Sequence, residues 1–227
     1  ETTAIYGTLL RFDPETGEYE GHLAESVEGN DDSTEWTLTL RDGVTFGDGT
    51  PLTAEAVRFG VERMRESTAN SGGLAQEVES MEVVDDRTIV FRLAQPWGTF
   101  PYVLAEEAGM VVNPAVASSV SAEELNTAPP PGAGAGPYVV ERFARDEEVV
   151  LRAKDDWWGG PVCIERLRFV SIPGGDATYE AFRSGEVQAA ILTDDRARAD
   201  AEADGVSGYG QAGGLGTMLV MNNGRTP

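Results

Sequence analysis

The sequence of 227 residues predicts an α/β fold of mixed α+β type, because three segments carry the periodicities of strands and helices. Residues 36–41 alternate apolar and polar side chains, which is typical of a half-buried strand. Residues 53–64 repeat apolar side chains at helical spacing. Residues 167–192 read as strand, helix and strand in turn, which predicts the start of a parallel sheet.

The first strand and the first helix are the clearest predicted elements. Trp36, Leu38 and Leu40 share one face of the strand, and we expect Trp36 to lie in the core. Glycine turns follow, and Thr53 is placed to cap the helix. The apolar side chains of this helix recur at steps of four and three residues, and the polar stretch after them predicts an end near Ser67.

A hairpin, a linker and a second pair of strands are expected next. Residues 81–84 and 88–93 are rich in β-forming side chains and flank turn residues, which predicts a hairpin. Residues 128–137 hold three successive prolines and alternating glycines, which continue neither a helix nor a central strand. This run is the strongest linker signal in the chain. Residues 138–143 and 147–152 are expected to form another strand pair.

The last part of the chain predicts a parallel strand–helix–strand unit. Residues 167–170 and 187–192 are the two expected strands, and a helix from Asp176 to Ser184 lies between them. Residues 217–221 form a further strand-like run close to the C-terminal end of the sequence.

Charge and cysteine content exclude several classes of function. The 17 Lys and Arg residues against 39 Asp and Glu residues give a formal charge of −22, which disfavours nucleic acid and anionic membranes as partners. Cys163 is the single cysteine, so it forms no disulfide within the chain and no cysteine cluster binds zinc. His22 is the single histidine, which excludes a two-histidine metal site. We therefore expect no metal and no cofactor. Nor does any apolar run reach the ~18 residues of a membrane span.

Three motifs suggest chemistry or binding but have simpler explanations. Residues 208–213 match Gly-x-Gly-x-x-Gly, yet a strand-like run follows instead of a helix, which argues against a dinucleotide site. The Asp-Asp pairs, as at residues 85–86, offer the two carboxylates of a glycosidase, but each falls at a predicted turn where aspartate bonds to the backbone. The tryptophan pair at residues 157–158 either packs against the core, which we favour, or stacks on a ligand.

Six short motifs, in order along the chain, resemble those of the extracellular solute-binding proteins of family 5, which serve ABC importers. The first three place a strand, a glycine turn and a capped helix, and the last three resemble the family's Gly-Thr-Gly-Pro-Tyr segment, its aromatic turn and a strand entry. The motifs are residues 23–26, 36–46, 48–57, 134–138, 157–160 and 184–187.

The resemblance implies a periplasmic-binding-protein-like fold of type II, in which two lobes close on a solute. It also implies that this chain is part of a longer protein. By that comparison, residues 1–131 are the extra subdomain of the first lobe, residues 132–160 return to the main sheet of that lobe, and residues 161–227 begin the second lobe.

The resemblance further implies a set of ligand-binding residues. The family's Gly-Thr-Gly-Pro-Tyr segment lines the cleft and binds peptide main chain, and Ala135 stands at the position of its threonine, so only backbone contacts are supported there. The loop after the first helix and the segment after Trp97 also reach the cleft in the family, and an aromatic side chain of the tryptophan turn completes the set. The set is Leu74, Gly109, Met110, Ala135, Gly136 and Trp158.

We therefore expect a binding protein and no enzyme: the substrate-binding component of an ABC importer, monomeric, which binds a peptide or similar small solute between two lobes and delivers it to a membrane permease. The alternatives are the same fold binding an oligosaccharide or another solute, and an exported acidic glycosidase with two catalytic carboxylates. The resemblance places the protein at the extracellular face of the cytoplasmic membrane or in the periplasm of a bacterium. Any export signal and lipid-anchoring cysteine precede Glu1 by that comparison.

Overall fold

The computed structural model of the protein describes residues 2–13, 15–65, 77–127 and 129–208. The chain divides into two compact units, Glu1–Ser171 and Ile172–Pro227, and each is described here by itself.

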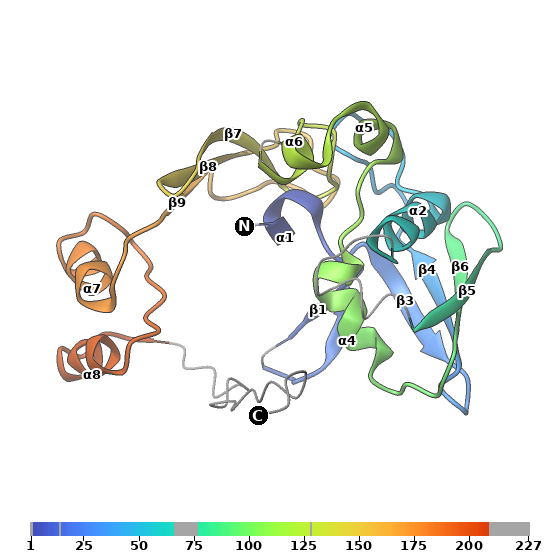
Figure 1. The fold of residues 1–227 in the computed structure, drawn as a ribbon, viewed down its shortest axis with the longest axis horizontal. Helices are drawn as coiled ribbons and strands as arrows, with labels where there is room; N and C mark the ends of the chain where they lie inside the picture. The colour runs from blue at the N-terminus through green and yellow to red at the C-terminus, as the bar shows by residue number, and fades with distance from the viewer. Residues whose placement is uncertain (1, 14, 66–76, 128, 209–227) are drawn as a thin grey trace, which may run out of the picture. The chain divides into compact units, whose positions relative to one another are not determined.

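A four-stranded antiparallel sheet is the centre of the first unit (Figure 1). Its strands lie in the order β3-β4-β6-β5, with bounds Ala24–Gly29, Glu35–Leu40, Thr88–Leu93 and Val78–Val83. The predicted strand and the predicted hairpin are both confirmed, since β5 and β6 pair antiparallel on either side of the Asp85–Arg87 turn. Within that turn, Asp85 Oδ1 accepts the backbone N–H groups of Arg87 and Thr88, both at 2.9 Å.

The alternation of β4 sets the position of the main core. Trp36, Leu38 and Leu40 are buried, and the residues between them are half-buried. The core prediction for Trp36 is confirmed, and its ring lies 6.0 Å from that of Phe100. Truncation of a buried leucine such as Leu38 to alanine generally costs about 2–5 kcal/mol.

Helix α2 (Ala54–Arg65) covers one face of the sheet and contacts β5 and β6 (Figure 1). Thr53 Oγ1 accepts the N–H of Ala56 at 3.3 Å, so the predicted cap is confirmed. Val57 and Val61 are buried against the sheet. The helix ends at Arg65, and the next described residue is Glu77.

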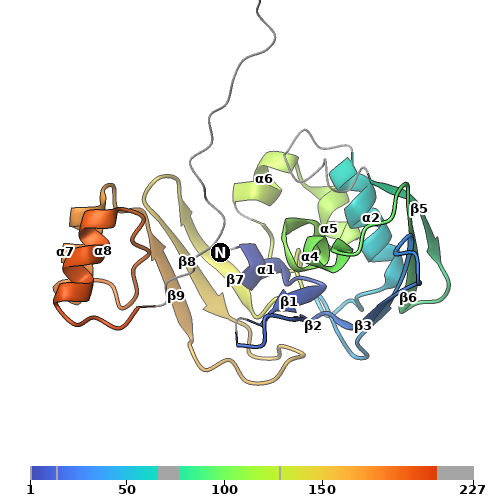
Figure 2. The same cartoon turned by 90° about the horizontal axis from the view of Figure 1, so that it is seen from below.

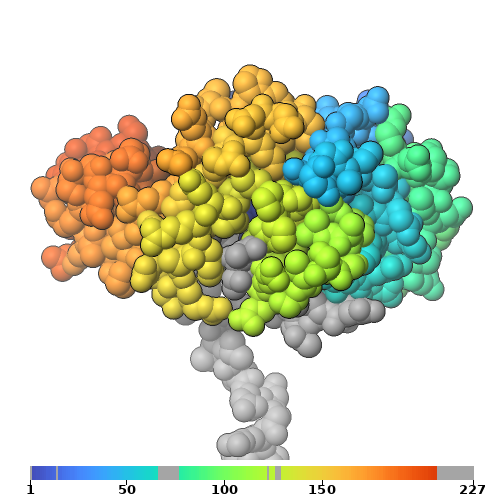
Figure 3. All heavy atoms as spheres, turned by 90° about the horizontal axis from the view of Figure 1, so that it is seen from above, coloured from blue at the N-terminus to red at the C-terminus, as the bar shows by residue number. Residues whose placement is uncertain are grey.

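Short helices occupy the middle of the first unit, where the sequence suggests only breaks. They are α4 (Phe100–Ala105), the 3₁₀ turn η1 (Glu107–Gly109), α5 (Pro114–Ser119) and α6 (Ala122–Thr127). Proline is compatible with the first turn of a helix because its missing N–H has no partner there in any case. Pro101 and Pro114 stand at such positions, so they begin helices instead of ending them. Figure 3 shows α5 packed directly against α2.

The N-terminal residues form α1 (Thr2–Tyr6) and a small hairpin of β1 (Leu10–Phe12) and β2 (Tyr19–Gly21). Figure 2 shows α1 and the β1–β2 hairpin between the two larger sheets of the first unit, with α1 next to β7 and β2 next to β3.

A three-stranded antiparallel sheet completes the first unit. It comprises β7 (Tyr138–Ala144), β8 (Glu148–Ala153) and β9 (Arg166–Val170) in that order. The predicted strand pair after the linker is confirmed. The prediction that residues 167–170 open a parallel sheet is wrong, because β9 pairs antiparallel with the free edge of β8.

The second unit contains helices α7 (Gly175–Arg183) and α8 (Asp195–Ala203), which pack through Tyr179, Ala197 and Ala201. The predicted helix is confirmed. The predicted strand at residues 187–192 is wrong in the described part of the chain, where these residues have no strand partner and Ile191 is 88% exposed. The strand-like run at 217–221 lies outside the described residues.

The division of the chain falls after Ser171, about ten residues beyond the expected start of a second lobe at residue 161. The reason is β9, which belongs to the three-stranded sheet of the first unit. The assignment of residues 1–131, 132–160 and 161–227 to lobes and subdomains stays a prediction. None of the helices in the described ranges is long and apolar enough to cross a membrane.

Candidate functional site

Residues 5–9 connect two segments that are predicted to bind the ligand, residues 109–110 and 135–136. The N–H of Leu9 donates to the carbonyl of Gly109 at 2.8 Å, and Thr8 forms an antiparallel bridge with Met110. The same stretch also bonds to residues 135–136. The N–H of Ala135 donates to the Tyr6 carbonyl at 3.2 Å, and the N–H of Gly136 donates to the Ile5 carbonyl at 3.0 Å. We call residues 5–9, 109–110 and 134–136 the junction.

Glycine is required where these segments meet. A Cβ atom on Gly136 would overlap the carbonyl oxygen of Ala4, and one on Gly134 would overlap that of Ile5. A side chain at Gly109 would likewise overlap the carbonyl oxygen of Leu104. The alternating glycines of the predicted linker therefore let two backbones approach closely, and this run is a packed part of the junction.

Two tryptophan rings cover Ala135. The indole nitrogens of Trp157 and Trp158 both donate to the Ala135 carbonyl oxygen, at 3.0 Å and 2.8 Å. The two rings are 5.0 Å apart with an interplanar angle of 56°, and both side chains are half-buried. Trp158 also packs against the main core, so each ring combines a structural contact with a face that solvent partly reaches.

His22 borders the junction on the side of Trp158, with its ring 6.0 Å from the indole. Its Nδ1 lies 3.0 Å from the carbonyl oxygen of Thr8. Burial lowers the pKa of His22, the hydrogen bond to Thr8 opposes that shift, and the positive charges of Arg11 and Arg41 lower the pKa further. The hydrogen bond with Thr8 and the ring contact with Trp158 both hold His22 against the junction.

Lys154 is the only lysine in the sequence, and it lies beneath the junction. Its ammonium donates to the carbonyl oxygen of Gly134 at 3.0 Å. Burial lowers the pKa of Lys154 to about 8, against the opposing effect of the carboxylates of Asp156 and Asp48. The Gly134 carbonyl also accepts the N–H of Gly47 at 3.1 Å, which ties the glycine turn of the first motifs to the junction.

Tyr6 and Asn113 fix the junction from the side of the short helices. The hydroxyl of Tyr6 donates to the carbonyl of Leu125 at 3.0 Å, and burial raises the pKa of Tyr6 to about 12. The side chain of Asn113 is buried and donates to the carbonyl oxygen of Gly132 at 3.2 Å, while its backbone N–H donates to that of Ala133 at 2.9 Å. These contacts hold the glycine run in place.

The structure brings five of the six predicted site residues to this one region. Gly109, Met110, Ala135 and Gly136 meet through residues 5–9, and Trp158 caps Ala135. Leu74 lies outside the described residues. The N–H groups of Ala135 and Gly136 donate to backbone carbonyls of residues 5–6, and the Ala135 carbonyl accepts hydrogen bonds from the two indole N–H groups. Their role in ligand binding stays a prediction.

Sequence reasoning missed Tyr6, Thr8, Asn113 and Lys154. The pair Asn113-Pro114 carries a readable signal, an N-cap residue before a proline at the first helical position. The contacts of Tyr6, Thr8 and Lys154 cross 14 or more residues of sequence and involve backbone carbonyls. No local pattern identifies such partners.

An open groove of about 570 Å³ runs along α7 and α8 in the second unit. Tyr179, Phe182 and Leu192 contribute apolar surface to it. None of the five predicted site residues in the described ranges lines this groove, so the junction is the candidate site. Among the described residues, no group of three or more His, Cys, Asp and Glu side chains is arranged to hold a metal ion.

The junction unites motifs spread over most of the chain, and comparison with known proteins explains why they occur together. The profile of the bacterial extracellular solute-binding proteins, family 5 Middle, matches residues 18–227. The chain belongs to this family. The resemblance seen in the sequence is thereby confirmed.

Several relatives of this family 5 chain are named as binding proteins. It is 30% identical over 238 residues to the Escherichia coli K12 protein named "Probable D,D-dipeptide-binding periplasmic protein DdpA", covering 100% of this chain and 45% of that protein. The ABC transporter-associated periplasmic binding protein DppA of Helicobacter pylori, solved with the peptide STSA, is 26% identical, with a TM-score of 0.67 over 81% of this chain and 40% of that one.

A third similar protein binds a different kind of solute. The binding protein AgaA of A. tumefaciens R10, solved with agropinic acid, is 27% identical, with a TM-score of 0.72 over 82% of this chain and 37% of that chain. The fold is that of the type II periplasmic binding proteins, and this chain covers part of it. It spans less than half the length of these three proteins.

Proposed function

We propose that the protein is the substrate-binding component of an ABC importer and that it binds a peptide or similar small solute and delivers it to a membrane permease. Membership of family 5 supports the class of function. The names of DdpA and of the H. pylori protein support a peptide as the solute. The protein acts outside the cytoplasm, as a monomer, at the membrane surface or in the periplasm.

The exposure of two side chains at the junction indicates which residues we expect to contact the solute. Met110 in the junction and Trp158 beside it are both half-buried, so each offers apolar surface next to a fixed backbone. Binding sites for small molecules combine such apolar surface with a few fixed polar groups. The polar groups of the junction are bonded to backbone carbonyls, an arrangement that suits holding a solute and not breaking its bonds.

Isothermal titration calorimetry with di- to hexapeptides tests the proposal, using the natural protein that contains this sequence. We expect at least one peptide class to bind and to be recovered intact. Trp158→Ala should weaken binding about tenfold or more, whereas Phe143→Ala, an exposed aromatic change on β7, should leave affinity unchanged. Hydrolysis of the bound peptide, or equal effects of the two variants, would contradict the proposal.

A non-peptide solute is the second candidate, because AgaA is similar to this chain and was solved with agropinic acid. The partly exposed rings of Trp157 and Trp158 are also compatible with stacking on a sugar. Binding of oligosaccharides or sugar-derived acids in the same titrations, without binding of peptides, would select this alternative. We do not propose the glycosidase further, since the relatives compared are binding proteins.

A further inference from the structure

An exposed row of aromatic rings begins beside the junction and is not among the predicted site residues. Phe12 and Tyr19 are register partners at the end of the β1–β2 hairpin, and their rings lie 5.4 Å apart. Tyr102 of α4 meets Tyr19 edge to face, with ring centres 6.1 Å apart and an interplanar angle of 82°. These three residues are the aromatic row. They are 45%, 37% and 46% exposed.

Strand geometry determines which way the row faces. Side chains alternate between the two faces of a strand, so Phe12 lies on the same face as Leu10, which is buried in the main core. Arg11 and Glu20 lie on the opposite face of the hairpin, where they form an ion pair at 2.9 Å. The row therefore extends the apolar surface of the core outward, and the charge pair of the hairpin points away from it.

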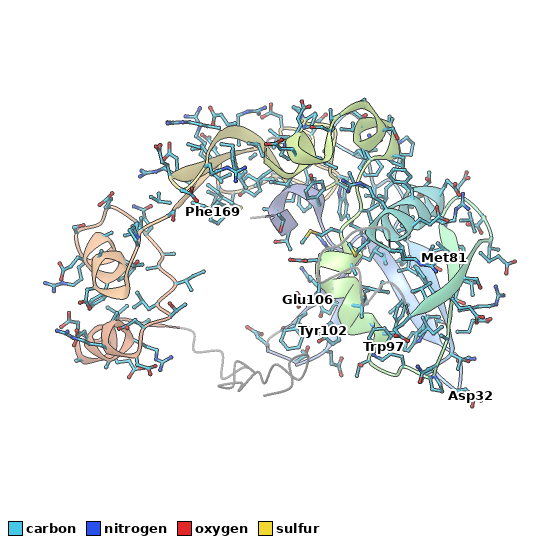
Figure 4. All side chains as sticks on the ribbon, viewed as in Figure 1. Asp32, Met81, Trp97, Tyr102, Glu106 and Phe169 are labelled. Atoms are coloured by element: carbon cyan, nitrogen blue, oxygen red, sulfur yellow. The ribbon has the colours of Figure 1, made fainter. Side chains whose placement is uncertain are left out.

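A carboxylate stands at the end of the row. Glu106 follows α4 directly, one helical turn after Tyr102, and its side chain is exposed. Figure 4 shows Tyr102 and Glu106 on neighbouring parts of the ribbon at the C-terminal end of α4. Burial, Tyr102 and the negative charge of Glu106 raise the pKa of Tyr19, so this carboxylate acts on the row electrostatically.

The row is continuous with the junction through the backbone. Strand β1 begins directly after Leu9, whose N–H donates to the Gly109 carbonyl. Helix α4 leads through Glu106 into η1, which ends at Gly109. A solute at the junction thus has the aromatic row as its neighbour along both of these segments.

We propose that the aromatic row and Glu106 bind a cationic side chain of the solute, the lysine or arginine side chain of a peptide. The faces of aromatic rings attract cations, and a carboxylate beside them adds a charge of the required sign. The apolar stem of a lysine or arginine covers ring surface while its charged end reaches the carboxylate. This inference rests on the proposed function and names a feature of the solute.

Matched peptides test the proposal by calorimetry on the natural protein. Ala-Lys-Ala, Lys-Ala-Ala and Ala-Ala-Lys are compared with the same tripeptides carrying norleucine, which keeps the apolar stem and removes the charge. At least one lysine peptide should bind about three- to tenfold more tightly than its norleucine counterpart. Glu106→Gln should remove this preference, and Tyr102→Leu should reduce it.

Glu79→Gln provides the control, since Glu79 is an exposed carboxylate on β5. This variant should keep the lysine preference. If lysine and norleucine peptides bind the unaltered protein equally, or if Glu79→Gln acts like Glu106→Gln, the cationic subsite is wrong while peptide binding stands. If only the norleucine peptides bind well, the row takes an apolar side chain instead. If none of these tripeptides binds, the cationic subsite is wrong, and the proposed function fails as well only if none of the di- to hexapeptides binds.

Discussion

The side-chain amide of Asn113 donates to Oδ2 of Asp48 at 2.9 Å across 65 residues of sequence. Asp48 belongs to the glycine turn before α2, and Asn113 is the N-cap of α5. The same amide donates to the Thr50 hydroxyl and to the Gly132 carbonyl, while Oδ1 of Asn113 accepts the N–H of Ala115. One buried side chain therefore joins the signature turn, a short helix and the glycine run.

Asn113→Ala should lower the free energy of unfolding by about 2–4 kcal/mol, because it removes a helix cap and leaves the buried Gly132 carbonyl without this donor. Urea denaturation followed by tryptophan fluorescence measures the change. Ser119→Ala, near the end of the same helix, is the control and should change stability by less than about 1 kcal/mol. If both substitutions lowered the free energy of unfolding equally, the hydrogen bonds of Asn113 would not stabilise the fold more than an ordinary surface contact.

Lys154 should titrate near pH 8 instead of at its ordinary 10.5. Reductive methylation with ¹³C-formaldehyde makes this group visible by NMR, and Lys154→Arg identifies its signal against that of the terminal amine. Because the pKa in the folded state lies below that of the unfolded state, the free energy of unfolding should rise between about pH 8 and 10.5. Lys154→Met should abolish that rise. A titration midpoint above 10 would contradict burial of the ammonium.

Trp157→Phe and Trp158→Phe should each cost about 1 kcal/mol, since each removes one hydrogen bond to the Ala135 carbonyl and leaves the other. The double substitution should cost more than the sum, because that carbonyl then loses both indole donors. A double-mutant cycle by chemical denaturation measures the difference. Strict additivity would mean that the two bonds do not compensate for each other.

Gly136→Ala should destabilise the protein by about 1–3 kcal/mol, because the new methyl group overlaps the carbonyl oxygen of Ala4 and separates the two backbones. Gly98→Ala, where the nearest atom outside the adjacent residues is 3.8 Å from the new Cβ, is the matched control. Thermal unfolding of the two variants should differ clearly. A stable Gly136→Ala protein would show that residues 4–6 can move away from residues 134–136.

The fold was predictable where one face of an element meets the core. The alternation of β4 and the cap of α2 are visible in the sequence and confirmed in the structure. Residues 187–192 show the limit, because an apolar run becomes a strand only when a neighbouring strand takes its hydrogen bonds. The pairing of β9 with β8 likewise depends on which edge is open, and periodicity contains no such information.

Only part of the candidate site was predictable from the sequence. The family resemblance pointed to Gly109, Ala135 and Trp158, which the structure brings to one region. The segment that unites them, residues 5–9, acts mainly through backbone groups that any sequence possesses. Its contribution therefore required three-dimensional coordinates.

The paired indoles over Ala135 also give this protein an optical signal of its own. Two such chromophores 5.0 Å apart and inclined at 56° couple their electronic transitions, which produces a split band in far-ultraviolet circular dichroism. Because both rings are anchored to one carbonyl oxygen, a small displacement of the junction changes their mutual angle and hence the sign or size of that band. If the proposed function holds, we expect solute binding to change this band, which needs no attached dye.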